Sequence, residues 1–145
     1  MEFTLVAPVL VSLMCGLAEF GQGLRQYHVM QKGVRDAARY LSRVPADPPC
    51  AGGGDDAWNA YVEPAENLAV YGARTPSTPL FKGWTKEATT WAIDTECLPN
   101  PRLNGADLPR VTVTATARYV DLGLLSFLGF DPITLTVSHQ ELKVS

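Results

Sequence analysis

The stretch FTLVAPVLVSLMCGLAEF at residues 3–20 is apolar or small at almost every position, and Glu19 is its only charge. As an α-helix rising about 1.5 Å per residue it spans about 27 Å, close to the roughly 30 Å hydrocarbon core of a bilayer. We therefore predict a transmembrane hydrophobic helix at residues 1–22. Glu19 lies at its far boundary and is interpreted as an interfacial acid.

A cleaved secretory signal is the first alternative to an anchor. Glu2 stands where a signal peptide has Lys or Arg, which argues against cleavage. Gly16 and Ala18 do form a small-x-small pair, so this alternative stays open.

Residues 23–44 favour an amphipathic continuation of the same helix. Less polar positions recur at spacings of three and four, with basic residues between them. Pro45 is predicted to stop the helix. One helix of about 43 residues would be about 65 Å long, and a cleaved signal would not need this continuation. The recurring positions are Leu24, Tyr27, Gln31, Val34, Ala38 and Leu41.

Residues 45–145 are predicted to form a small α+β domain, in which an antiparallel sheet packs on the amphipathic half of the helix. Alternation of apolar and polar side chains is clearest at residues 111–120 and again at residues 133–137. The alternation then changes parity towards Leu142 and Val144, which predicts a β-bulge near His139. Residues 67–71 and 89–93 are candidate short strands, and Asp55-Asp56 is predicted to cap a short helix through Trp58 and Val62.

LGLLSFLGF at residues 122–130 separates the last two predicted strands. It is either a loop or short helix folded back as core, or an exposed apolar lobe that meets the membrane surface or a neighbouring subunit. In the second case Leu125 and Phe127 are candidate contact residues.

The distribution of charge and the positions of the cysteines argue against two classes of function, nucleic-acid binding and zinc binding. The chain is about +2 up to Val44 and about −5 beyond it, which gives no support to nucleic-acid binding. Cys50 and Cys97 lie in Pro/Gly-flanked sequence, outside any CxxC pair and far from either His, so a zinc site is not expected. A disulfide between them in an oxidising compartment is favoured, with two free thiols as the alternative.

Several segments resemble TadE-like proteins, the minor pseudopilins of the tight-adherence (Tad) pilus, a type IV pilus-like system. The resemblance is strongest at Glu2-Phe3, LVAPVLV (5–11), AEFG (18–21) and AARY (37–40). NLAVYG (67–72), PLFKGWT (79–85), VTVTATARYV (111–120) and PITLTVS (132–138) are similar to later parts of that family.

The resemblance implies a pseudopilin-like subunit or assembly factor of a Tad-type (Flp) pilus, with other pilins, pseudopilins and inner-membrane assembly proteins as partners in surface attachment. It also implies that Glu2, followed by Phe3, meets the N-terminal amine of a neighbouring subunit; a solvated helix-end acid is the alternative. Ser12 and Gly16 form a small-xxx-small pair that lets another helix approach closely. Family members carry a basic leader ending in Gly, whereas only Met1 precedes Glu2 here, so an upstream leader and an unprocessed chain both remain open.

The expected location is the bacterial inner membrane, with a single span and the C-terminal domain in the periplasm. The positive-inside rule applied to residues 25–43 alone would put that domain in the cytoplasm. The charge of an upstream leader and the cysteine pair favour the periplasm. Incorporation in an extracellular pilus stays open.

An enzyme is not expected. The sequence has no G-x-S-x-G, no HExxH and no phosphate-cradling loop, and His28 and His139 are interpreted as structural. We expect no metal and no cofactor. The alternative function is an unrelated single-pass periplasmic binding module, which a ligand-sized pocket would favour; a hydrolase ranks third.

Overall fold

The computed structural model describes residues 2–49, 56–99 and 107–143, and the side chains of residues 6–49, 57–99 and 108–143. It confirms the predicted α+β fold, a long N-terminal helix on a small antiparallel sheet. Cys50, Asp55 and Val144 lie outside the described residues. In chain order the elements are α1 (Glu2–Leu41), α2 (Asp56–Tyr71), β1 (Thr89–Pro99), β2 (Asp107–Arg118), α3 (Leu124–Phe127) and β3 (Thr134–Leu142).

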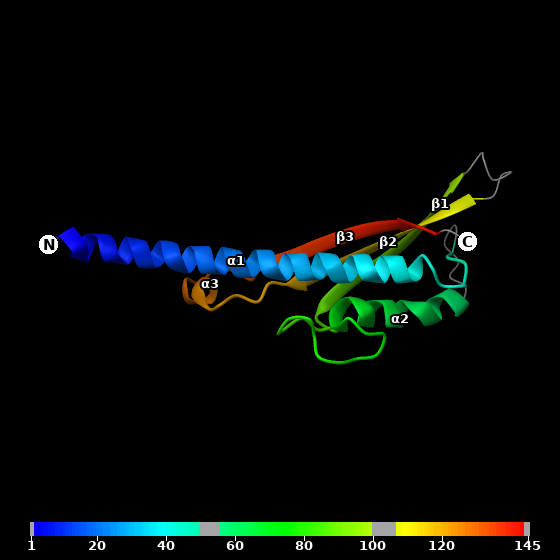
Figure 1. Cartoon of the computed structure of the whole chain (residues 1–145), viewed down its shortest axis with the longest axis horizontal. Helices are drawn as coiled ribbons and strands as arrows, with labels where there is room; N and C mark the ends of the chain where they lie inside the picture. Colours follow the sequence, from blue (N-terminus) through cyan, green and yellow to red (C-terminus); the bar gives the residue numbers. More distant parts are fainter. Residues whose placement is uncertain (1, 50–55, 100–106, 144–145) are drawn as a thin grey trace.

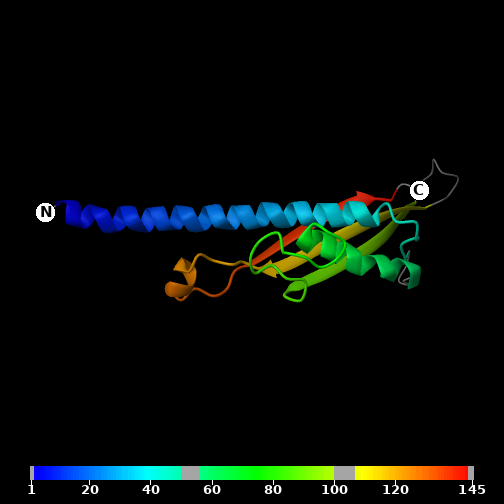
Figure 2. The same cartoon turned by 60° about the horizontal axis from the view of Figure 1, so that its bottom comes forward.

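Helix α1 continues through Pro8, Gly21 and Gly23 as one helix of 40 residues, about 60 Å long. It ends at Leu41, four residues before Pro45, and Ser42 closes it by donating from Oγ to the Arg39 carbonyl at 2.9 Å. The C-terminal half packs on the rest of the chain, whereas the N-terminal half projects well beyond it (Figures 1 and 2). The two halves therefore meet very different surroundings.

The buried stripe of α1 differs from the predicted one in its first turns. Leu24, Tyr27 and Gln31 are exposed, whereas Gln26 is buried. Gln26 can be buried because its side-chain amide forms hydrogen bonds with the backbone of Val120. Hydrophobic spacing had instead predicted that its neighbours Leu24 and Tyr27 face the core. The later positions were predicted correctly, and the fully buried residues of this half are Met30, Val34, Ala37, Ala38 and Leu41.

The prediction of a strand at residues 67–71 was wrong, because these residues form the last turns of α2. This helix is also longer than the short one predicted from Asp55-Asp56. Trp58, Ala65 and Ala69 recur at helical spacing and are buried in the core. The helix ends at Tyr71 and is followed by Gly72, whose φ of 68° is left-handed and whose N–H donates to the Leu68 carbonyl at 2.9 Å.

Helices α1 and α2 lie side by side (Figure 1), and their backbones come close together at Gly33. A Cβ added there would lie 2.4 Å from the Ala69 carbonyl oxygen and 3.1 Å from Cη2 of Trp84. Only glycine therefore permits this spacing of the two helices.

The three strands form one antiparallel sheet in the order β1-β2-β3. Strand β2 turns Val111, Val113 and Ala115 into the core, as the alternation predicted, and its threonines to the other face. On that face Thr114 and Thr116 make hydroxyl hydrogen bonds of 3.0 Å to Ser138 and Thr136 of β3. One face of the sheet is thus apolar and packs on α1, and the other is polar.

The bulge predicted near His139 was wrong. Pairing between β2 and β3 runs unbroken from Arg118↔Thr134 to Arg110↔Leu142, with Val113 opposite His139. The side chains keep alternating between the two faces of the sheet, so Leu142 is exposed and Lys143, which follows the strand, points inward. The Lys143 ammonium donates to the carbonyls of Val44 and Ala46 at 2.6 and 2.7 Å, which offsets the cost of burying it.

Candidate assembly and membrane surface

The N-terminal half of α1 is apolar and faces outward. It is long and apolar enough to cross a membrane, and little of its most apolar window is buried by the rest of the chain. Large apolar side chains are exposed along its whole length, as in a membrane span or a helix packed among other helices. They are Val6, Val9, Leu10, Val11, Leu13, Met14, Leu17 and Phe20.

Ser12 and Gly16, the predicted small-xxx-small pair, lie on this exposed half. The Ser12 hydroxyl donates to the Pro8 carbonyl at 2.9 Å, so its polar group is satisfied within the helix. Nothing lies within 4 Å of a Cβ placed at Gly16. The surface is therefore open to a second helix. Glu2 and Phe3 belong to α1, but their side chains lie outside the described residues.

Glu19, interpreted from the sequence as an interfacial acid, is buried against the rest of the chain. Its side chain is 8% exposed and accepts hydrogen bonds from three donors that lie about 100 positions later in the chain. The Tyr119 hydroxyl donates to Oε2 at 2.7 Å, and the backbone N–H groups of Leu122 and Leu124 donate to Oε1 at 3.1 and 3.0 Å. A buried carboxylate needs such donors, and here they come from the segment between β2 and β3.

Tyr119 is held in place for this contact. Its N–H bonds the Ile133 carbonyl at 2.8 Å, and its ring passes beside Gly23. Burial, together with its hydrogen bond to Glu19, raises the pKa of Tyr119, so the hydroxyl stays protonated and remains a donor.

Gln26 makes a second contact of the same kind, seven residues further along α1 on the same face. Its Nε2 donates to the Val120 carbonyl at 2.6 Å, and its Oε1 accepts from the Val120 N–H at 3.0 Å. Through these hydrogen bonds, Glu19 and Gln26 hold residues 119–124, the segment directly after β2, against α1.

The segment held in this way is the apolar lobe, defined as residues 122–130. Of the two alternatives for it, the structure has the exposed one: no residue of α3 is buried, and Phe127 is 85% exposed. Leu125, the other predicted contact residue, is half-buried. Leu122, Leu128 and Phe130 are also exposed.

Sequence reasoning missed Glu19, Gln26 and Tyr119 as a group. One signal was present: a lone carboxylate inside an apolar run needs a partner. Its donors could not be located, because two of the three are backbone amides that carry no sequence signature.

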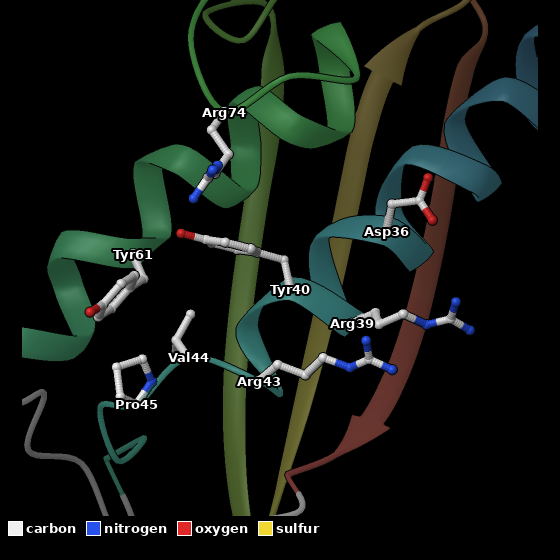
Figure 3. A pocket seen from close by; sticks show the side chains of 8 residues that line it. All are labelled: Asp36, Arg39, Tyr40, Arg43, Val44, Pro45, Tyr61 and Arg74. Atoms are coloured by element: carbon white, nitrogen blue, oxygen red, sulfur yellow. The ribbon is translucent and has the colours of Figure 1, made fainter.

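A hollow of about 460 Å³ lies between the end of α1 and α2, lined by Asp36, Arg39, Tyr40, Arg43, Val44, Pro45, Tyr61 and Arg74. Its volume falls within the range of small-molecule sites. Tyr40 points towards α2, but Arg39, Arg43 and Asp36 project to the opposite side of α1 (Figure 3). The charged groups therefore do not converge, as they would in a specific polar site.

Cys97 lies in β1 opposite Pro109. Two residues before it on the same face, the Thr95 hydroxyl donates to the Pro49 carbonyl at 2.6 Å. Cys50 itself lies outside the described residues, so the disulfide stays a prediction. Cys15 is half-buried on α1 with a free thiol.

Within the part of the chain that the structure describes, no group of three or more His, Cys, Asp or Glu side chains could hold a metal ion. His28 lies on α1 with its ring edge-on to Tyr27, and His139 Nε2 lies 3.1 Å from Oε1 of Glu141 on β3. Both histidines are thus engaged with side chains of their own elements.

Residues 1–39 match the family model described as TadE-like protein. The match begins with the apolar run and ends two residues before α1 does. It confirms the resemblance for this segment. Neither the curated proteins nor the solved structures compared with the chain gave a match.

Proposed function

We propose that this chain, which is TadE-like over residues 1–39 and thereby associated with the Tad pilus, acts as a pseudopilin-like subunit or assembly factor of that pilus. It is anchored in the bacterial inner membrane by the first half of α1 and carries its C-terminal domain in the periplasm. It works by helix–helix and subunit–subunit contact, and not as an enzyme.

The observation that carries the proposal is the contrast between the two halves of α1. A soluble domain has no use for a projecting helix that exposes Val9, Leu13 and Leu17 to water. In a bilayer, or among the helices of a pilus, the same side chains are solvated by lipid or packed against partners. Because lipid gives helices no hydrophobic drive to associate, close approach at small residues is the favoured contact there.

The test is pilus output in a strain that lacks the gene and is complemented with variants. Gly16→Leu fills the open position and is expected to reduce piliation severalfold without changing the amount of protein in the membrane. Gly21→Leu is the matched control, since Gly21 also has nothing within 4 Å of a Cβ but lies outside the small-xxx-small pair. Wild-type piliation in the deletion strain without complementation would contradict a role in the pilus.

The alternative, a tethered periplasmic binding module, has the 460 Å³ hollow in its favour. Its charged side chains do not converge (Figure 3), so we rank this function second. The gene deletion separates the two functions, because loss of an unrelated binding module would leave piliation at the wild-type level. Arg74→Ala, at the rim of the hollow, tests whether a pilus role uses the hollow: piliation should be unchanged if it does not.

A further inference from the structure

The apolar lobe is an ordered element that presents hydrophobic side chains outward. Its turn is closed by backbone bonds from Phe127 N–H to the Gly123 carbonyl and from Phe130 N–H to the Leu125 carbonyl, each 3.0 Å long. Asp121 adds a second closure, accepting from the Ser126 N–H at 2.9 Å and from its hydroxyl at 2.7 Å. A defined turn that exposes two phenylalanines together with Leu128 is the kind of apolar patch that marks a contact site.

The lobe lies level with the end of the apolar run. Glu19 is the last residue but one of that run, and the amides of Leu122 and Leu124 lie 3.1 and 3.0 Å from its carboxylate. Figures 1 and 2 both place α3 beside α1 on the N-terminal side of the sheet. If the run occupies the hydrocarbon core, as the proposed anchor requires, the lobe stands at the membrane–water boundary.

Basic side chains lie behind the lobe, on the side of the domain. Arg25 and Lys82 line a hollow that also contacts Leu122, and Arg118 lines one that contacts Phe130. All three are exposed. Two carboxylates oppose these cations: Asp131 is exposed, and Asp121 lines both hollows and keeps its charge while it accepts hydrogen bonds from Ser126. An apolar tip whose adjoining hollows carry three exposed cations and two carboxylates fits the interface between acyl chains and headgroups.

We infer that the apolar lobe is a membrane foot: Phe127, Leu128 and Phe130 insert about 5–10 Å into the headgroup and acyl boundary of the bilayer that α1 crosses. Glu19 and Gln26 fix the foot to α1, so the domain is held at a set height and rotation on the membrane. The inference rests on the anchor in the proposed function and adds a second lipid contact to it.

The test uses the full-length protein in liposomes at low protein density. Phe127→Cys in a Cys15→Ser background is labelled with the fluorophore nitrobenzoxadiazole, and the Cys15→Ser parent gives the labelling background. Because Phe127 is so exposed, its replacement leaves the fold intact. Lipids brominated near the headgroup end of the acyl chain should quench the label at residue 127, and aqueous iodide should not.

Two matched sites make the outcomes distinguishable. A label at Val9, in the middle of the run, should be quenched best by deeply placed bromine and reports the anchor alone. A label at Gln140, exposed on β3, should respond to iodide only. Quenching at Val9 with iodide access at residue 127 overturns the foot and leaves the anchor standing, whereas iodide access at both sites overturns the anchor as well.

A neighbouring subunit is the competing occupant of the lobe. In that case the label at residue 127 would be shielded from iodide without being quenched by brominated lipid, and the shielding would fade as the protein is diluted in lipid. That result would also overturn the foot. Quenching by shallow bromine that persists on dilution supports it.

Discussion

The hydroxyl of Tyr119 lies 2.7 Å from Oε2 of Glu19, although 100 positions separate the two residues in the chain. The contact joins the end of the apolar run to the start of the segment that follows β2. Everything attached to that segment, the apolar lobe included, is therefore held against α1 just where the helix leaves the domain.

Glu19→Ala should loosen the lobe without unfolding the sheet, because the N–H groups of Leu122 and Leu124 lose their acceptor. Hydrogen bonds to charged groups contribute about 1.5–3 kcal/mol, so hydrogen exchange of these two amides should accelerate about tenfold or more. Glu19→Gln keeps one acceptor oxygen and should fall between Ala and wild type. Asp131→Asn, an exposed carboxylate in the same region, is the control and should leave both amides unchanged.

Gln26→Ala should lower the free energy of unfolding by about 1–3 kcal/mol, because it leaves two partly buried backbone groups without their partner. The two groups concerned are the N–H and carbonyl of Val120. Gln31→Ala is the matched control, since Gln31 is exposed on the same helix. Chemical denaturation of both variants measures the difference; equal midpoints would show that the Gln26 amide carries no stability.

Gly33→Ala should separate α1 from α2. The added Cβ would lie 2.4 Å from backbone at Ala69, which cannot move aside as a side chain can, and overpacking of this kind costs about 1–3 kcal/mol. Gly21→Ala adds the same methyl group in open space and should be neutral or stabilising by up to about 1 kcal/mol through helix propensity. The melting temperature should thus fall for Gly33→Ala and stay level or rise for Gly21→Ala, and a neutral Gly33→Ala would contradict the close approach.

Cys50 and Cys97 are predicted to be bonded. The hydrogen bond from Thr95 to Pro49 holds the residue before Cys50 against the strand that carries Cys97, which supports the pairing. A loop of about 48 residues closed in this way stabilises by roughly 3–4 kcal/mol in the chain-entropy model. Mass spectrometry after maleimide treatment of the native, unreduced protein should find Cys15 as the one labelled site. Labelling of Cys97 under these conditions would refute the bond.

The sequence predicts those parts of the fold in which the residue type alone indicates whether a side chain faces the core or the outside. The projecting helix follows from the apolar run, and β2 follows from the alternation from Val111 to Tyr119, since both patterns record which side faces the core. The strand predicted at residues 67–71 failed because a short run such as Leu68-Ala69-Val70 fits a buried helix and a buried strand equally well.

The polar contacts could not be predicted for a different reason. The partners of Glu19 and Gln26 are largely backbone groups, and only the three-dimensional path of the chain after Arg118 brings them to α1. The burial of Lys143 could not be read from the strand pattern either, because it depends on the carbonyls of Val44 and Ala46, which follow α1. The sequence left two alternatives for the lobe, a buried one and an exposed one, and the exposed side chains of the structure decide for the second.

Alkaline carbonate extraction of membranes from cells that produce the full-length chain tests the account most directly. The account predicts that the full chain stays in the pellet, because about 18 apolar residues of α1 are held by the hydrocarbon core. It predicts that a chain lacking residues 1–17, which keeps Glu19 and its contacts, is released and remains folded. Release of the full-length protein by carbonate would contradict the membrane anchor.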